Sequence, residues 1–93
     1  MYCRVVHIKF VSEIQMKMVS SYMEHTMLPR NLAAGQISGE VFKISENEVF
    51  TISKHPDKAD KIMALMQQEL KEIAVGSKLT KLEGQLLIGA SPA

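Results

Sequence analysis

The central part of the chain, residues 37–54, reads ISGEVFKISENEVFTISK and contains two short runs of alternating apolar and polar residues. The runs at 37–44 and 49–54 have the two-residue period of a β-strand whose two faces differ in polarity. The segment between them, Ser45-Glu46-Asn47-Glu48, is wholly polar. Two such runs joined by a short polar segment predict an antiparallel β-hairpin.

The segments on either side of this hairpin extend the pattern. Apolar residues alternate along residues 3–11 and then recur at helical spacing along residues 11–27. After the hairpin, helical spacing returns at residues 56–74, and a last strand-like run covers residues 79–88. The order strand, helix, strand, strand, helix, strand is the split βαβ plan of an α+β sandwich. We expect a four-stranded antiparallel sheet in the order 4-1-3-2, with both helices on one face.

Capping and turn residues set the expected ends of these elements. Ser12–Gln15 has the spacing of a capping box at the start of the first helix. Pro29 is expected to end that helix, and Gly39 to mark a β-bulge in the second strand. Pro56 is expected in the first turn of the second helix. Gly76 is expected to stop the second helix.

Length and composition indicate one domain that spans residues 1–93. The net charge is +1, with lysines spread along the chain, so the basic patch typical of nucleic-acid binding is missing. No apolar run approaches the roughly 20 residues of a membrane span. The single cysteine, Cys3, excludes an internal disulfide, and no signal pattern precedes the first strand. We therefore expect a cytoplasmic protein without nucleic-acid or membrane partners.

The two faces of the expected sheet differ in polarity. We assign the more apolar face to the helices; it contains Val6, Ile8, Phe10, Phe42, Ile44, Phe50 and Ile52. The opposite face is mixed and contains Cys3, Val5, His7, Lys9, Val41, Lys43, Val49, Thr51 and Ser53. Gly84 leaves two phases open for the last strand, so either Glu83, Gln85 and Leu87 or their neighbours join this second face.

Three interpretations compete for the mixed face. A platform for single-stranded RNA needs aromatic residues on the central strands, and this expected face has none there. A fully solvated face would leave Val5, Val41 and Val49 as an apolar patch in water. Pairing with the same face of a second copy would bury these valines and enclose the polar residues in a cavity. We therefore predict a homodimer that forms through this face.

The order of elements, the small size and the half-polar second face resemble the dimeric α+β barrel superfamily, which has a ferredoxin-like fold. The similarity is greatest to its antibiotic-biosynthesis-monooxygenase-like branch, and it extends from Cys3 to about Ile88, including Ser53-Lys54-His55-Pro56 before the second helix. The resemblance implies a homodimer whose sheets enclose a ligand pocket. Members of the superfamily include oxygenases without metal or flavin, haem-degrading enzymes that carry a pocket Trp, and proteins of unknown function. This chain contains no Trp.

His7 is the candidate catalytic residue, because histidine titrates near neutral pH and so suits a general base. The other interpretation is a histidine that only packs against a neighbour across the sheet or the dimer interface. Lys9 and Lys43 are candidates to hold an anionic group or an enolate oxygen, although such lysines often extend into water. Thr51 is the remaining substrate-binding candidate. The three histidines lack metal-ligand spacing, so we expect neither a metal site nor a cofactor.

Two functions of different class remain open from the sequence. One is a cofactor-independent oxygenase that acts on a small aromatic or quinone-like molecule, with His7 as the base. The other is a non-catalytic small-molecule-binding or regulatory module that uses the same cavity or the dimer interface. A loss of turnover in a folded His7→Ala variant would favour the enzyme.

Overall fold

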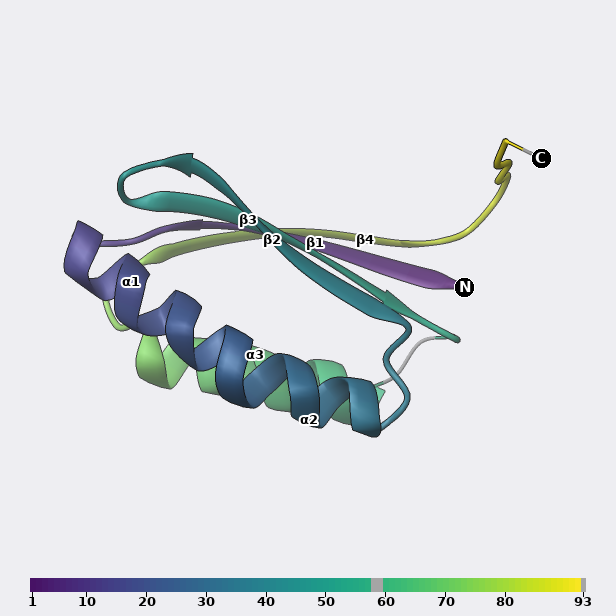
Figure 1. Cartoon of the computed structure of the whole chain (residues 1–93), viewed down its shortest axis with the longest axis horizontal. Coiled ribbons are helices and arrows are strands. Elements are labelled where there is room, and N and C mark those ends of the chain that lie inside the picture. The colour runs from purple at the N-terminus through teal and green to yellow at the C-terminus, as the bar shows by residue number, and fades with distance from the viewer. Residues whose placement is uncertain (58–59, 93) are drawn as a thin grey trace.

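The computed structural model describes residues 1–57 and 60–92 of the chain. Within these residues, four strands form one antiparallel sheet in the order β2-β3-β1-β4, and the helices cover one of its faces (Figure 1). The strands are β1 Tyr2–Lys9, β2 Ser38–Ser45, β3 Glu48–His55 and β4 Lys78–Gln85. The predicted split βαβ plan and strand order are confirmed.

The first helical segment starts at the predicted capping box. The Gln15 backbone N–H donates to Ser12 Oγ at 3.0 Å, and the Gln15 side-chain carbonyl accepts from the Val11 backbone N–H at 2.9 Å. These bonds satisfy two backbone donors at the start of α1, Glu13–Tyr22. The Gln15 amide also donates to the Val75 carbonyl at 2.9 Å, which ties this end of α1 to the segment after the last helix.

The prediction that Pro29 ends the first helix is wrong. The π-helix η1, Met23–Met27, follows α1 directly, and α2, Leu28–Ala33, continues from it. Proline breaks a helix because it lacks an N–H and its ring meets the carbonyl four residues earlier. Pro29 is the second residue of α2. Directly before it the Leu28 N–H donates to the Met23 carbonyl, five residues earlier, and this wider π-helical turn accommodates the proline.

The expected bulge lies elsewhere in the hairpin. Gly39 pairs regularly with Ser53, and the register shift falls between Lys43 and Ser45, beside the turn. Gly39 has a different role, since a Cβ at this position would collide with the side chain of Leu28 on α2. A glycine here lets the helix pack closely against the strand.

The second helix, α3, is Asp60–Ile73. Pro56 lies in a bend before it rather than in its first turn, and residues 58–59 are outside the described residues. Gly76 follows the helix with a positive φ of 84°, as expected for a helix stop.

The core lies between the helices and the β1 and β3 side of the sheet. Its buried apolar side chains are Val6, Ile8, Phe10, Met16, Val19, Met23, Met27, Val49, Leu70 and Ala74. The hairpin turn is fixed to this core, because the Phe10 N–H donates to the Asn47 carbonyl at 2.8 Å and the Asn47 amide donates back to the Phe10 carbonyl at 3.2 Å.

The facing of β1 is as predicted, but the facing of the hairpin is inverted. Directly opposed residues of an antiparallel pair project to the same face. His7 lies opposite Phe50, and Phe50 lies opposite Phe42, so these aromatic rings are on the side of His7, away from the helices. Val49, by contrast, is only 2% exposed beneath the helices. The register therefore moves Val41, Lys43, Val49, Thr51 and Ser53 to the helix side, and Phe42, Phe50 and Ile52 to the other.

Candidate functional site

We call the sheet surface that the helices leave uncovered the open face. Its residues are Cys3, Val5, His7, Lys9, Glu40, Phe42, Glu48, Phe50, Ile52, Lys54, Thr80 and Leu82. β4 pairs regularly through Gly84, which settles the phase of the last strand: Leu82 shares the face of Val5, and Glu83 shares the face of Arg4. The open face is the candidate functional surface of the protein.

The middle of the open face is apolar and carries an aromatic pair. The Phe42 and Phe50 rings stack with centroids 4.8 Å apart and planes 16° apart. Phe42 is 42% exposed, and Leu82, which lies opposite Val5, is 74% exposed. Phe42 and Leu82 lie on the two edge strands, and the half-buried Phe50, Ile52 and Val5 connect them across β3 and β1. Together these side chains form the kind of apolar patch that marks an interaction site.

A charged group borders this patch at one end. His7 Nε2 lies 3.5 Å from Glu48 Oε2, and Lys9 Nζ lies 3.8 Å from Glu48 Oε1. Glu48 is the first residue of β3 and is paired with Lys9 in the sheet register, which explains why the carboxylate reaches both side chains. The arrangement can orient an imidazole and hold a cation beside an apolar surface.

The four predicted site residues do not all come together. His7 and Lys9 lie on the open face beside Glu48. Lys43 is paired with Val49 and lines a shallow hollow beneath α1, on the helix side. Thr51 also projects to the helix side, because its partner Val6 is buried there. The structure thus separates Lys43 and Thr51 from His7.

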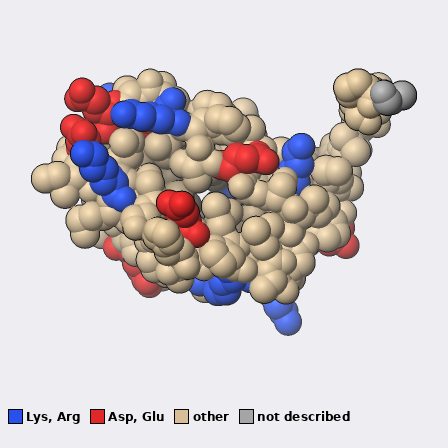
Figure 2. Space-filling model, in the orientation of Figure 1, with Lys and Arg blue, Asp and Glu red and all other residues tan. Residues whose placement is uncertain are grey.

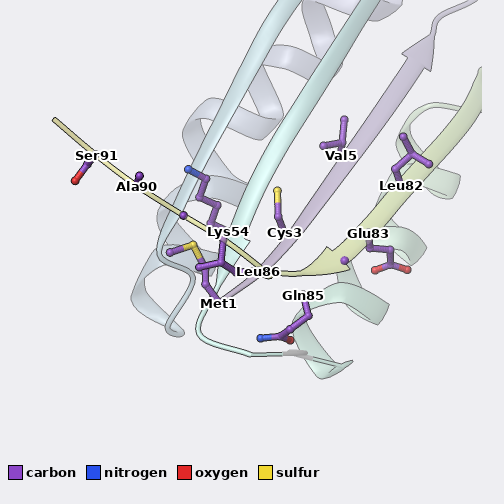
Figure 3. A pocket seen from close by; sticks show the side chains of 12 residues that line it. Met1, Cys3, Val5, Lys54, Leu82, Glu83, Gln85, Leu86, Ala90 and Ser91 are labelled. Carbon is purple, nitrogen blue, oxygen red and sulfur yellow. The ribbon is translucent and has the colours of Figure 1, made fainter.

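A groove of about 900 Å³ lies at the other end of the open face. Cys3, Val5 and Leu82 project into it from the sheet, whereas Glu83 projects to the opposite side (Figure 3). The C-terminal tail, residues 86–92, supplies its other wall. The backbone N–H of Leu86 donates to the Met1 carbonyl at 2.7 Å, and beyond this bond the tail leaves the sheet (Figure 1).

The tail exposes large aliphatic side chains. Leu87 is 91% exposed and Ile88 is 86% exposed. Both come shortly after the last strand, which ends at Gln85, and belong to the segment that stands on the open-face side of the sheet (Figure 1). The tail therefore extends the apolar character of the open face beyond the edge of the sheet.

Other classes of site have little support in the described part of the chain. No group of three or more potential metal-binding side chains is found among these residues. No helix within residues 1–57 and 60–92 combines the length and apolar character needed to cross a membrane. Charged side chains of both signs are interspersed on the face that Figure 2 shows, without a continuous basic stripe.

Comparison with known proteins gives matches at the level of structure. No protein-family model and no curated protein matches the chain. A dimeric ferredoxin-like protein from an uncultured marine organism superposes with a TM-score of 0.77 at 10% identity, covering 96% of this chain and 97% of that chain. HapK from Hahella chejuensis superposes with a TM-score of 0.74 at 12% identity, covering 100% of this chain and 99% of that chain. The chain has a ferredoxin-like α+β fold.

A third similar structure is the monooxygenase from the gene ActVA-Orf6 of Streptomyces coelicolor, solved in complex with the ligand nanaomycin D. It superposes with a TM-score of 0.58 at 16% identity, covering 97% of this chain and 92% of that chain. Similarity at these identities shows the fold alone and assigns no site residue to this chain.

Three features of the open face were missed in the sequence. The sequence pattern places Glu48 in the turn of the hairpin. Its position just before Val49 could have shown its role, because the start of this strand pairs with the end of the antiparallel first strand, at Lys9. The stacked phenylalanines were assigned to the wrong face. The tail carried a visible signal, the three aliphatic residues Leu86, Leu87 and Ile88 just before a Gly.

Proposed function

We propose that the protein is a homodimer whose two open faces pack together and enclose a pocket for a small aromatic or quinone-like molecule. The stacked Phe42 and Phe50, with Leu82 beside Val5, support this assembly because an uncovered patch of this kind is unfavourable in water. The exposed Leu87 and Ile88 of the tail are proposed to pack against the second copy. Two of the solved neighbours, each a ferredoxin-like protein from an uncultured marine organism, are described as dimeric.

We further propose that the pocket supports a cofactor-independent oxygenation. The contact between His7 and Glu48 is the observation that supports this chemistry. With Glu48 Oε2 3.5 Å from Nε2, Nδ1 is left as the basic nitrogen of His7. It removes a proton from a CH₂ group activated by neighbouring rings or carbonyls. Lys9 stabilises the resulting oxyanion. The anion forms a C–O bond with dioxygen, and loss of water leaves a carbonyl, so one oxygen atom enters the product and the other enters water.

The test of this chemistry uses His7→Ala and Glu48→Gln, with His25→Ala as the matched control. His25 is an exposed histidine on η1 whose Nε2 lies 3.8 Å from Glu24. Binding of nanaomycin D and oxygen uptake with reduced quinone-like substrates are measured for each variant. We expect His7→Ala to lose at least about 100-fold in turnover, Glu48→Gln to lose less, and His25→Ala to behave as the unaltered protein. Equal turnover in His7→Ala and His25→Ala would refute the role of His7.

The alternative function is a non-catalytic binding module that uses the same pocket. It is favoured by the separation of Lys43 and Thr51 from His7, which leaves fewer polar groups beside the imidazole than an enzyme site was expected to have. Binding of nanaomycin D without oxygen uptake, and with the same affinity in His7→Ala, would support the binding module over the oxygenase.

A further inference from the structure

A second hollow lies on the helix side of the sheet, apart from the open face. It has a volume of about 220 Å³ and lies between α3 and the strands β1 and β4. Three aliphatic side chains line it, and its polar lining consists of Arg4, Gln67, Lys71 and Lys81. We call this hollow the Arg4 cleft. Three of its four polar lining residues are cationic.

Arg4 is the unusual member of this group, because it is only 3% exposed. One terminal nitrogen, Nη1, donates to the Met63 carbonyl at 3.2 Å, whereas Nε has no hydrogen-bond partner. None of the carboxylates in the described residues forms an ion pair with the guanidinium. An arginine stays charged in proteins, so burial of this group without an anion costs free energy. Burial lowers the pKa of Arg4, and the nearby Glu83 offsets only part of this effect.

The other polar groups of the cleft come from separate elements. Lys71 and Gln67 belong to α3, and Lys81 belongs to β4. Lys81 Nζ lies 3.4 Å from Gln67 Oε1 and 3.5 Å from Glu83 Oε1. Glu83 is the register partner of Arg4 in β4. The cleft therefore combines a buried guanidinium with two more exposed ammonium groups, against one neighbouring carboxylate.

We propose that the Arg4 cleft binds a small oxyanion of the phosphate type, with the buried Arg4 guanidinium as the inner donor and Lys71 and Lys81 as its outer partners. A single planar carboxylate would be satisfied by one guanidinium, whereas cations from three directions match the charge and the tetrahedral oxygens of a phosphate. The volume of the cleft suits inorganic phosphate or a short phosphomonoester. This inference does not depend on the function proposed for the open face.

The experiment is a calorimetric titration of the full chain with inorganic phosphate and, in parallel, with glycerol 3-phosphate, at constant ionic strength set with chloride. We expect saturable binding that weakens about fivefold in Lys71→Gln and in Lys81→Gln. Glu83→Gln removes the competing carboxylate and should tighten binding about threefold. Lys17→Gln is the matched control, because Lys17 is an exposed lysine on α1 that pairs with Glu13; it should bind as the unaltered protein does.

The relative affinities of the two anions identify the ligand. Tighter binding of glycerol 3-phosphate than of inorganic phosphate supports the proposal with a phosphomonoester as the ligand, and tighter binding of inorganic phosphate supports it with free phosphate. Lack of saturable binding for both anions overturns it. Equal weakening in Lys17→Gln and Lys71→Gln also overturns it, since the effect would then reflect net charge alone. An Arg4→Lys variant, checked for folding by circular dichroism, should bind weakly, and full affinity in this variant would exclude Arg4 as the donor.

Discussion

Replacement of Leu82 by alanine should weaken the proposed dimer strongly. The substitution removes about three CH₂ equivalents, or roughly 2.4 kcal/mol of burial free energy at about 0.8 kcal/mol each. Leu82 is 74% exposed in the single chain, so about 1.8 kcal/mol of this remains available for association. A twofold interface contains the residue twice, which gives about 3.5 kcal/mol per dimer. At about 1.4 kcal/mol per tenfold change, the dissociation constant should rise about 300-fold.

Sedimentation equilibrium over a wide range of protein concentration measures this constant directly. Leu65→Ala is the matched control, because Leu65 is also an exposed leucine, at 45%, but lies on α3 in the helix layer. The control should leave the dissociation constant within about twofold. If Leu82→Ala changed the constant no more than Leu65→Ala does, the open face would not be the dimer interface. If the unaltered chain were monomeric at high micromolar concentration, the proposed dimer would likewise be refuted.

Three further predictions concern stability. Glu69 accepts two hydrogen bonds from Arg30, at 2.5 and 2.9 Å, and one from Tyr22 at 2.6 Å. Glu69→Gln should therefore lower the free energy of unfolding by about 1–2 kcal/mol. Thermal unfolding measures this loss, which should be much smaller in the exposed control Glu72→Gln. Burial, with the field of Arg4 as a second cause, lowers the pKa of His55. The unfolded chain therefore binds the proton more readily than the folded chain, so the free energy of unfolding should fall as the pH drops below about 6.5, by at most about 1.4 kcal/mol per pH unit. Urea titrations at several pH values measure this dependence, and the slope of the free energy of unfolding against pH should be shallower in His55→Gln. An unchanged slope would contradict this cause. Gly39→Ala should cost about 1–3 kcal/mol because the new methyl group meets Leu28, whereas Gly84→Ala meets open space and should not destabilise the chain in the same assay.

The fold was predictable because each element carries its own local signal. Ser12–Gln15 marked the start of the first helix, and Gly76 marked the stop after the second. The path of the first helix past Pro29 was not predictable from the proline alone, since its effect depends on the π-helix before it. A π-helix has no simple sequence signal, because its stability comes from packing rather than from local preference.

The candidate site was only half predictable, and the reason is the register of one hairpin. A shift of one residue moves every side chain of a strand to the other face. The alternation of apolar residues predicts that the more apolar set, including Phe50, lies under the helices, but pairing with β1 directs Phe50 outward and Val49 inward. The rule that the most apolar face meets the helices fails here, because pairing with β1 turns the more apolar set of the hairpin, Phe42, Phe50 and Ile52, away from the helices and the mixed set toward them. The open face therefore does carry an aromatic side chain on the central strand β3, so a lack of aromatic residues does not exclude stacking there.

The π-helix in the first helical segment has a consequence for insertions and deletions. Each residue of an α-helix advances the direction of the side chains by about 100°. The five residues of η1 form one wider turn, so everything after it is rotated relative to an unbroken helix, and this rotation brings Arg30 to Glu69. The number of residues in this turn thus determines how far α2 is rotated about its own axis. An insertion or deletion in the hairpin turn at Glu46 and Asn47 would change only the connection between two strands. The same change in η1 would rotate all the side chains of α2 to new directions.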